Sequence, residues 1–261
     1  MVIRNGETPF QQAYGSADVT RGRPITADTL FDLASDAKPF TALAIAQLEA
    51  RGLVDPVVPL TEVFSDLPGI YAQVRVRDLI HHLGGLPDYH DALREGETGT
   101  SVTNADVLAF YRSCKALSHP PGTRFDYSTG GYNLLATLIE RASGQSYANY
   151  LHEYILTPAG MDASFIVGER TKPEGCAESY SEWPSFELTA QGPCDHLVGE
   201  GGLWSKHRGG VVEREECAPY PVVCSNRRLP PRIGTEVEQP APDAGPSALS
   251  DTVERAAQCI G

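Results

Sequence analysis

One long apolar stretch, which runs from Phe40 to Leu48, constrains the fold of this chain more than any other feature. Pro39 stands directly before it, and a proline is tolerated only in the first turn of a helix, because further inside it would clash with a carbonyl and delete a hydrogen bond. Gly52 follows the stretch and suits the residue after a helix C-cap. The pattern therefore predicts a helix that begins close to Ser35. Since this helix is apolar nearly all round, we expect it to be buried in the middle of a domain.

The charge balance narrows the classes of function. The chain has 261 residues with 21 Lys and Arg against 34 Asp and Glu, which gives a formal net charge of −13. Such a charge repels phosphate backbones and anionic lipid, and this argues against nucleic acid or a membrane surface as partners. No window approaches the ~20 apolar residues of a membrane span, and the start of the chain lacks a secretory signal. We expect a chain without a membrane span that is cytoplasmic as it stands, and leave open that its beginning is missing.

Local signals predict further elements in the first 205 residues. Asn5-Gly6 suits the turn of a hairpin over residues 2–15. Three helices are expected from a capping box, a leucine stripe and a serine cap: Thr103 to Ala116, Gly131 to Ala142 and Tyr147 to Leu156.

Residues 206–261 differ in character from the rest. They hold one aromatic residue, three of the six cysteines and seven of the twenty prolines, and they show no helical or strand period of useful length. Short strands at Val211-Val212 and 221–223 and a helix from Ser247 to Cys259 are the only elements expected there. The six cysteines, at 114, 176, 194, 217, 224 and 259, form no Cys-x-x-Cys pair, so we expect free thiols, with a disulfide set or a metal site as the alternatives.

Ser35 and Lys38 carry the strongest chemical signal. A serine at a helix N-terminus lies where free N–H groups favour a developing oxyanion, and a lysine three residues later projects from the same face. A buried lysine could accept the serine proton and turn a poor nucleophile into a competent one. Ser-x-x-Lys alone is a weak pattern, and without further context a capping serine followed by a solvated lysine explains it better.

Several segments in one order strengthen the first reading, because they resemble the serine β-lactamase and penicillin-binding-protein superfamily, in its class C β-lactamase-related branch. The resemblance runs from about residue 2 to residue 205. The similar segments are Phe31 to Thr41 around the nucleophile, Asp78 to Tyr89, Pro121 to Leu135, Gly144 to Leu151, Pro158 to Met161 and Gly199 to Ser205.

The resemblance implies a mixed α/β (α+β) fold of the β-lactamase/transpeptidase type. Residues 36–165 would form a helical wall of the cleft, facing an antiparallel sheet that is begun by the N-terminal hairpin and is incomplete here. Ser35 would be the acylated nucleophile, Lys38 its proton partner, and Tyr127 an acid or base, with the three converging in one water-poor niche. A phenol is a poor base at neutral pH, so Tyr127 would need the Lys38 charge beside it.

The same resemblance implies a serine hydrolase that acts through an acyl-enzyme on an ester, amide or β-lactam carbonyl. Its partner would be a small-molecule or peptide-like acyl substrate, and it would use no cofactor and no metal. The oligomeric state stays open.

Two departures from the family pattern put turnover in doubt. Thr129 stands where the family has an asparagine that orients substrate and lysine. The third motif, Lys-Thr-Gly or His-x-Gly on a strand beside the cleft, has no Lys-Thr-Gly counterpart in the chain, and His207-Arg-Gly209 follows Ser205 too closely. We therefore expect a truncated hydrolase domain over residues 1–205 and a divergent tail over 206–261, which is either disordered or the product of an altered reading frame.

Other interpretations remain open. The chain could be a catalytically impaired remnant, that is, a pseudoenzyme or binding module of the same family, or an unrelated structural interaction protein. His81, His82, Asp88 and His90 suggest a metal site, but packing and hydrogen bonding explain them better. We expect Glu200 to support a turn and the pair Glu215-Glu216 to lie on a solvated face, and we assign a catalytic role to neither.

Overall fold

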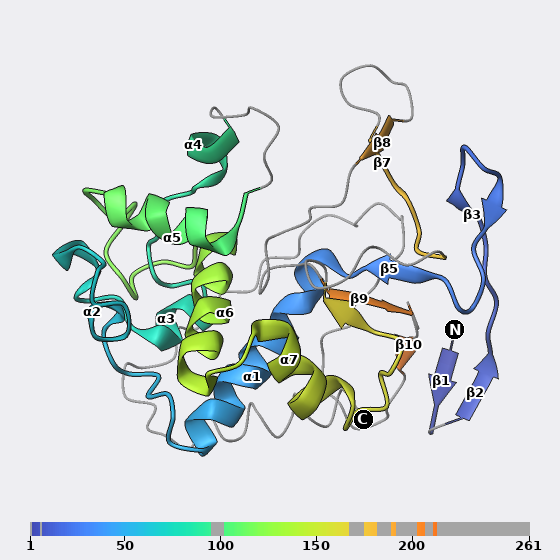
Figure 1. The fold of residues 1–261 in the computed structure, drawn as a ribbon, viewed down its shortest axis with the longest axis horizontal. Coiled ribbons are helices and arrows are strands. Elements are labelled where there is room, and N and C mark those ends of the chain that lie inside the picture. The colour runs from blue at the N-terminus through green and yellow to red at the C-terminus, as the bar shows by residue number, and fades with distance from the viewer. Residues whose placement is uncertain are drawn as a thin grey trace, which may run out of the picture.

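The computed structural model describes residues 2–5, 7–94, 102–166, 175–181, 189–191, 203–206 and 211–212. A 15-residue helix, α6 (Thr129–Ser143), lies at the centre of its helical part (Figure 1). The Ser128 Oγ accepts the Gly131 N–H at 3.2 Å at the start of α6, and Gly144 ends the helix with φ +71°. Residues 130–136 of α6 are all buried. The helix predicted from the leucine stripe is confirmed and begins slightly earlier than expected.

Helix α1 (Lys38–Ala50) packs against α6 and forms the second element of the core. Pro39 lies in its first turn, and the Leu53 N–H donates to the Leu48 carbonyl at 2.9 Å around Gly52, whose φ is +68°. Residues 40–49 of α1 are buried or half-buried on every side. Both predicted boundaries and the predicted burial of this helix are confirmed.

The remaining helices surround this pair. They are η1 (Ala34–Ala37), α2 (Leu60–Val63), η2 (Gly69–Tyr71), α3 (Val76–Ile80), α4 (His90–Arg94), α5 (Asn104–Ser113), α7 (Tyr147–Leu151) and the π-helical turn η3 (His152–Leu156). The capping box predicted at Thr103 is present, but α5 ends at Ser113 because Cys114 turns to an extended ψ of 140°. Ser146 caps α7 as predicted, by accepting the Asn149 N–H at 3.2 Å.

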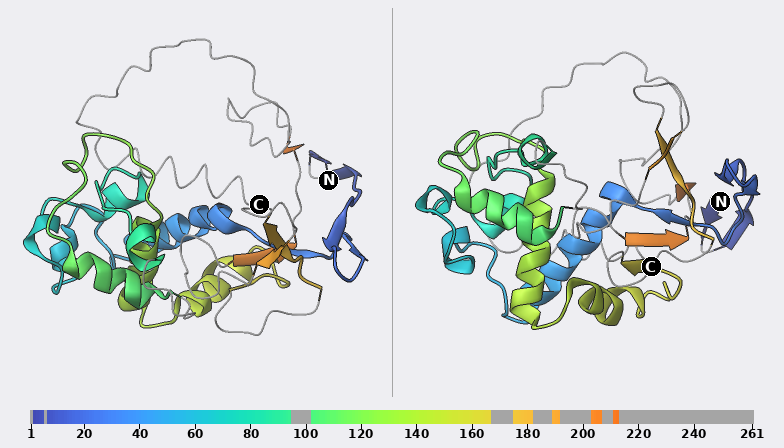
Figure 2. Two further views of the ribbon diagram at one scale, coloured as in Figure 1. Left: turned by 90° about the horizontal axis from the view of Figure 1, so that it is seen from above. Right: turned by 45° about the horizontal axis from the view of Figure 1, so that its top comes forward.

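The strands gather at the other side of the molecule, away from α2, α3 and α5 (Figures 1 and 2). Strand β9 (Leu203–Lys206) is the middle of a three-stranded antiparallel sheet between β5 (Leu30–Asp32) and β6 (Phe165–Ile166). The smaller pairs are β3 (Ser16–Asp18) with β4 (Arg23–Pro24) and β7 (Ser179–Ser181) with β8 (Thr189–Gln191). The three-stranded sheet around β9 is the important one for the candidate site, because its strand β5 leads directly into η1 and α1.

The predicted N-terminal hairpin is confirmed. Strands β1 (Val2–Arg4) and β2 (Glu7–Phe10) pair antiparallel, and Asn5 in the turn has φ +51°. Strand β10 (Val211–Val212), also expected from the sequence, pairs with β1 in parallel. Within the described residues these three strands form a sheet separate from that of β9, whereas the family resemblance implies one antiparallel sheet that begins with the hairpin. The residues of β2 are all exposed, and Phe10 keeps 48% of its surface in solvent.

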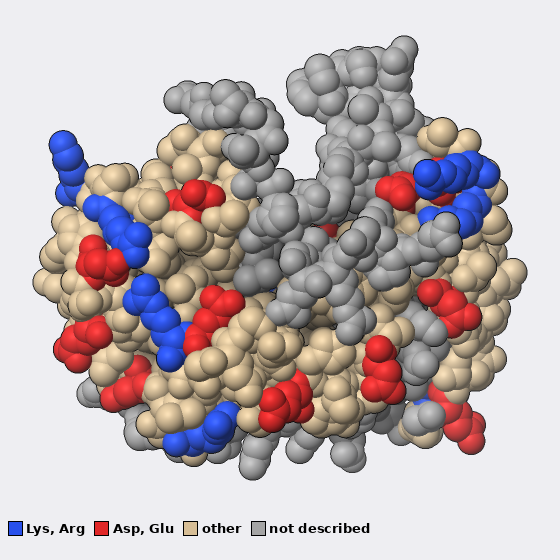
Figure 3. Space-filling view, viewed as in Figure 1, with Lys and Arg blue, Asp and Glu red and all other residues tan. Residues whose placement is uncertain are grey.

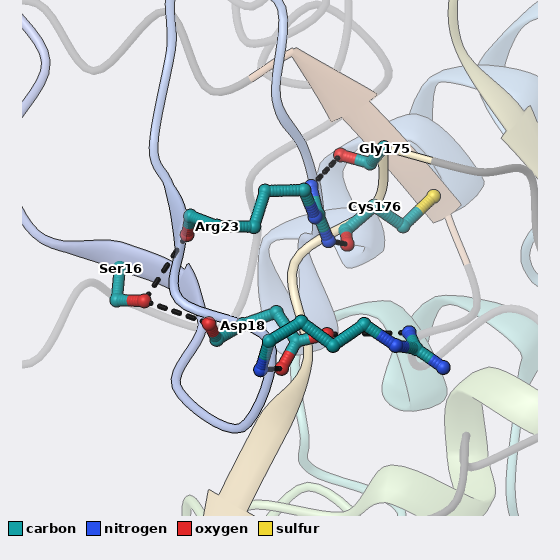
Figure 4. A network of polar contacts seen from close by, with 6 residues as sticks. Ser16, Asp18, Arg23, Gly175 and Cys176 are labelled. Carbon is teal, nitrogen blue, oxygen red and sulfur yellow. Dashed lines mark hydrogen bonds and ion pairs between the residues drawn. The ribbon is translucent and has the colours of Figure 1, made fainter.

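A polar network ties the β3–β4 hairpin to the segment before β7 (Figure 4). The Arg23 guanidinium donates to the carbonyls of Gly175, at 3.0 Å, and Cys176. The buried Asp18 pairs with Arg21 at 3.2 Å and accepts its backbone N–H at 2.9 Å. This network holds Cys176 beside the aromatic stack of Phe165 and Trp204, a second cluster next to β5.

Charged side chains of both signs are scattered over the face shown in Figure 3, and the acidic ones do not gather into one patch. Among the described residues, no helix combines the length and the apolar character that crossing a membrane requires.

Candidate active site

A strained turn places Ser35 at the junction of strand and helix. The Leu33 N–H donates to the Leu203 carbonyl of β9 at 2.9 Å, so the end of β5 is fixed to the sheet. Ala34 then adopts φ +46°, a left-handed conformation that non-glycine residues avoid, and its N–H donates to the Asp32 Oδ1 at 2.8 Å. Ser35 therefore enters the first turn of η1, where backbone N–H groups have no partner within the helix.

The structure brings together Ser35, Lys38 and Tyr127. The Lys38 Nζ lies 3.1 Å from the Ser35 Oγ, which is the i to i+3 contact expected from the helix. The Tyr127 hydroxyl reaches the same oxygen at 2.8 Å from the loop that precedes α6. Two groups able to exchange protons thus contact one hydroxyl oxygen.

Lys38 lies between aromatic rings. Its Nζ is 5.1 Å from the ring centre of Tyr127 and 5.6 Å from that of Tyr132, distances at which the face of an aromatic ring attracts a cation. The Tyr132 hydroxyl donates to the Ile80 carbonyl at 3.0 Å. Burial, with a smaller contribution from Tyr127, raises the pKa of Tyr132 to about 12, so this second phenol stays neutral.

The three groups differ in their access to solvent. Lys38 keeps only 5% of its surface exposed, whereas Tyr127 keeps 51% and Ser35 is exposed. The expected water-poor niche is therefore limited to the lysine. The amine is thus buried, while the serine hydroxyl that it contacts is open to solvent.

His82 completes the surroundings of Tyr127. Its ring lies against the Tyr127 ring with centres 4.5 Å apart and against Tyr132 at 5.2 Å. Its Nδ1 accepts the Ser128 N–H at 3.1 Å. Burial and the nearby Lys38 charge lower the pKa of His82, so the imidazole is neutral at neutral pH.

A cavity of about 230 Å³ opens beside Tyr127. It is lined by residues 86–90 and 126–130 together with Tyr111 and Ser118. Thr129, the departure from the family's asparagine, belongs to this lining and is the first residue of α6. The cavity offers room for part of a substrate next to the phenol.

The histidines that suggested a metal site face different partners. The His90 Nδ1 lies 2.7 Å from the Asp88 Oδ1, and its ring stacks on Tyr89. His82 instead binds the backbone of Ser128. Within the described residues no group of three His, Cys, Asp or Glu side chains converges as metal ligands would.

Cys114 and Cys176 are free thiols, as expected, and they are the two cysteines that the structure describes. The other sequence candidates lie outside the described residues. These are His207-Arg-Gly209, Glu200, Glu215-Glu216, the expected strand at 221–223, the expected helix from Ser247 to Cys259, and the cysteines at 194, 217, 224 and 259.

Sequence reasoning missed the part that His82 plays at Tyr127. Packing and hydrogen bonding were expected of His82 in preference to a metal site, but no local spacing connects it with a tyrosine 45 positions later. The two segments of the family resemblance that contain these residues, Asp78 to Tyr89 and Pro121 to Leu135, are the ones that meet here.

Known proteins resemble this chain over the same region. A penicillin-binding protein of Bacillus subtilis is 35% identical over 178 residues, which cover 67% of this chain and 39% of that protein. Esterase EstB of Burkholderia gladioli is 32% identical over 198 residues, which cover 70% of this chain and 49% of that one. The chain thus spans less than half the length of either relative.

Solved structures agree on the fold. The octameric penicillin-binding protein homologue from Pyrococcus abyssi superimposes with a TM-score of 0.70 at 31% identity, over 78% of this chain and 48% of that chain. The expected mixed α/β fold of the β-lactamase and penicillin-binding-protein type is therefore confirmed. The family model described as Beta-lactamase matches residues 1–211, and the chain belongs to the beta-lactamase family.

Proposed function

We propose that this chain is a serine hydrolase in which Ser35 forms an acyl-enzyme with an ester, amide or β-lactam carbonyl. The observation that carries the proposal is the double contact on the Ser35 Oγ, from the Lys38 amine at 3.1 Å and the Tyr127 phenol at 2.8 Å. A serine hydroxyl becomes a useful nucleophile only when a neighbouring group takes its proton, and the Tyr127 oxygen can do so in its phenolate form.

The acylation step uses this contact directly. The Ser35 Oγ attacks the carbonyl carbon while its proton passes to Tyr127, whose deprotonated form the adjacent Lys38 ammonium stabilises. At rest the Tyr127 hydroxyl donates to Ser35. The step begins once this phenolic proton has been lost to solvent, so that the phenolate oxygen accepts the hydrogen bond, and then the proton, of the Ser35 hydroxyl. The carbon–oxygen or carbon–nitrogen bond of the substrate then breaks, and Tyr127 returns the proton to the leaving group.

Deacylation reverses these roles. A water molecule attacks the acyl carbon, gives its proton to Tyr127, and the Ser35 oxygen leaves with a proton from the same phenol. The Ser35 N–H, in the first turn of η1, would stabilise the oxyanion in both steps. The family's second oxyanion donor comes from the third-motif strand, and losing one such donor typically costs ~10²–10³ in turnover.

The substrate class rests on the relatives. Their names include penicillin-binding proteins, D-aminopeptidases, an esterase and a β-lactamase. What these share is an acyl compound of small-molecule or peptide size, and the cavity of about 230 Å³ beside Tyr127 would take a substituent next to the reacting carbonyl. We place the hydrolase domain at residues 1–205, with 206–261 as a divergent tail.

The test is intact-mass analysis of the full chain after incubation with a fluorophosphonate, a penicillin or a p-nitrophenyl ester. We expect one covalent adduct on the wild type, none on Ser35→Ala, and an unchanged adduct on Ser113→Ala, which removes an exposed serine at the end of α5. Absence of any adduct from all three reagents would refute the proposal.

A non-catalytic family remnant is the second candidate function. Two observations favour it, namely that Thr129 replaces the expected asparagine and that no Lys-Thr-Gly occurs in the chain. It predicts saturable binding of a β-lactam, seen by calorimetry, without an adduct. An adduct that forms but does not turn over would instead mark a hydrolase arrested after acylation.

A further inference from the structure

His82 holds both sides of Tyr127. It lies just beyond α3, and its carbonyl accepts the Asp126 N–H at 2.8 Å, while its Nδ1 accepts the Ser128 N–H at 3.1 Å. Asp126 and Ser128 are the two chain neighbours of Tyr127. The His82 ring also lies against the Tyr127 ring, with centres 4.5 Å apart and the planes tilted by 32°. One residue therefore contacts the backbone on either side of Tyr127 as well as the face of its ring.

The backbone of His82 is itself held in an unfavourable conformation. Its φ is +57°, in the left-handed region that side-chain-bearing residues rarely adopt. Such strain persists only where the surroundings impose it, and it is concentrated at functional sites. Here the conformation directs the carbonyl and the ring of His82 to the same loop.

The contact with Ser128 defines the protonation state of the ring. Because Nδ1 accepts a hydrogen bond from a backbone N–H, it carries no proton, and a neutral imidazole then has its proton on Nε2. A protonated ring would turn an N–H at Nδ1 toward the N–H of Ser128, and the hydrogen bond would be lost.

We propose that His82 is the positioning residue for Tyr127, and that it keeps the phenol on the Ser35 oxygen only while its imidazole is in the neutral Nε2–H form. This inference rests on the proposed function for its catalytic consequence, although the positioning itself is a property of the folded chain. Protonation of His82 would break the contact of Nδ1 with the Ser128 N–H, whereas the His82 carbonyl would still accept the Asp126 N–H. The Ser128 side of the loop would then be free to move and would carry the phenol away from Ser35. Activity would therefore fall as the pH is lowered through the pKa of His82.

The groups around the His82 ring determine the pH range in which this imidazole becomes protonated. Lys38 approaches it from α1, Tyr127 and Tyr132 lie on its faces, and the exposed His81 is its chain neighbour. Burial first, then the Lys38 charge, lower the pKa of His82, and the Ser128 N–H opposes them less strongly. The Asp126 carboxylate on the same loop faces Arg124, at 3.0 Å, and the His119 Nε2, at 3.5 Å. The acid limb is thus expected below ~6.5, the ordinary value of histidine.

Two substitutions separate the contacts of His82. His82→Asn keeps an acceptor in the place of Nδ1, tolerates a positive φ better than most residues and does not titrate. His82→Phe keeps an aromatic ring against Tyr127 but leaves the Ser128 N–H without its acceptor. His81→Asn is the matched control, since it removes an adjacent histidine whose pKa burial also lowers.

The rate of Ser35 acylation by a p-nitrophenyl ester is measured from pH 4.5 to 8 for each variant. We expect an acid inflection in the wild type and in His81→Asn that His82→Asn lacks, with a rate for His82→Asn at pH 7.5 within about tenfold of the wild type. His82→Phe should lose about tenfold or more in kcat with little change in KM. An inflection that survives in His82→Asn, or a wild-type rate in His82→Phe, would overturn the proposal.

A readout without turnover keeps this test separate from that of the proposed function. In protein labelled with ¹³Cζ-tyrosine, the Tyr127 resonance, assigned by its loss in Tyr127→Phe, should shift with the titration of His82 and stay constant in His82→Asn. A Tyr127 resonance that ignores the His82 titration refutes the positioning role even if the chain acylates. A wild type that shows the shift but no Ser35 adduct refutes the hydrolase and leaves the positioning role standing.

Discussion

The phenol of Tyr127 donates a hydrogen bond of 2.8 Å to the Ser35 Oγ from 92 residues further along the chain. This contact joins the sheet to the helical part of the fold. Ser35 follows strand β5 of the sheet, and Tyr127 lies in the loop that precedes α6. Lys38 is buried between them and touches the serine as well. The candidate site therefore depends on the packing of α1 against α6.

Tyr127→Phe isolates the hydroxyl from the ring. The substitution keeps the stack on His82 and the ring beside Lys38, so we expect the melting temperature to change little. Loss of a proton-transferring group typically lowers a rate by ~10²–10⁴, and we expect Ser35 acylation to fall by this factor. Stopped-flow measurement of p-nitrophenol release gives the rate. Tyr14→Phe, at a tyrosine that is 68% exposed, is the control and should react as the wild type does.

Lys38→Met tests whether the lysine serves chemistry rather than stability. Burying an ammonium is costly, so replacing it by a neutral side chain of similar length should leave the melting temperature unchanged or raise it. Acylation of Ser35 should nevertheless be lost. Lys115→Met, at an exposed lysine, should alter neither property. A clear drop in melting temperature for Lys38→Met would indicate that the lysine is structural.

The parts of the fold that follow local rules could be predicted from the sequence. Pro39 and Gly52 limit a helix by their own backbone restrictions, and a serine and a lysine three residues apart must share a helix face. The family resemblance added Tyr127, which no local rule connects with Ser35. The prediction that α5 reaches Ala116 was wrong, because Cys114 leaves the helix with an extended ψ of 140°.

Tertiary contacts account for what the sequence left unpredicted. Alanine carries no preference for the left-handed conformation that Ala34 adopts, and the hydrogen bonds of Leu33 to Leu203 and of Ala34 to Asp32 hold the chain on either side of this turn. The hold of His82 on Tyr127 likewise exists only when α3 and the loop before α6 are packed together. Residues of this kind become visible only in three dimensions.

Asp106 gives a pH-dependent contribution to stability. Its carboxylate accepts hydrogen bonds from the Thr103 Oγ1 at 2.6 Å and the Thr103 N–H at 2.8 Å, and these bonds lower the pKa of Asp106. A carboxyl whose pKa is lower in the folded state stabilises the fold above its unfolded pKa, and this stabilisation is lost as the pH falls through the folded value. We expect Asp106→Asn to lower the free energy of unfolding at pH 7 by about 0.3–1 kcal/mol.

Urea unfolding at two pH values checks this. The difference between wild type and Asp106→Asn should shrink at pH 3, which lies below the unfolded aspartate pKa of ~3.9, because the unfolded wild-type chain then binds a proton more readily than the folded one. Asp162→Asn, at an exposed turn residue, should show no such dependence. A difference of equal size at both pH values would mean that the charge of Asp106 is irrelevant.

Substitution by alanine should change the stability of the fold in opposite directions at two neighbouring glycines of α6. A Cβ at Gly130 would lie 1.9 Å from the hydroxyl oxygen and 2.8 Å from the Cζ of Tyr111, a fully buried side chain whose hydroxyl donates to the Pro87 carbonyl. A Cβ at Gly131 meets ordinary contacts of 3.7 Å. Alanine in a helix interior is usually better than glycine by ~1 kcal/mol, so Gly131→Ala should be neutral or stabilising. Gly130→Ala should instead destabilise by about 1–3 kcal/mol through overpacking.

Because Tyr111 and Gly130 also line the cavity beside Tyr127, the same substitution should disturb substrate binding. If the buried ring of Tyr111 shifts to make room, it moves within the cavity wall, and KM for an ester with a bulky acyl group should rise more than KM for an acetyl ester. Urea unfolding and steady-state kinetics of Gly130→Ala and Gly131→Ala measure both effects. Equal stability of the two variants would show that Tyr111 yields freely, and an unchanged ratio of the two KM values would show that the cavity does not receive the acyl group.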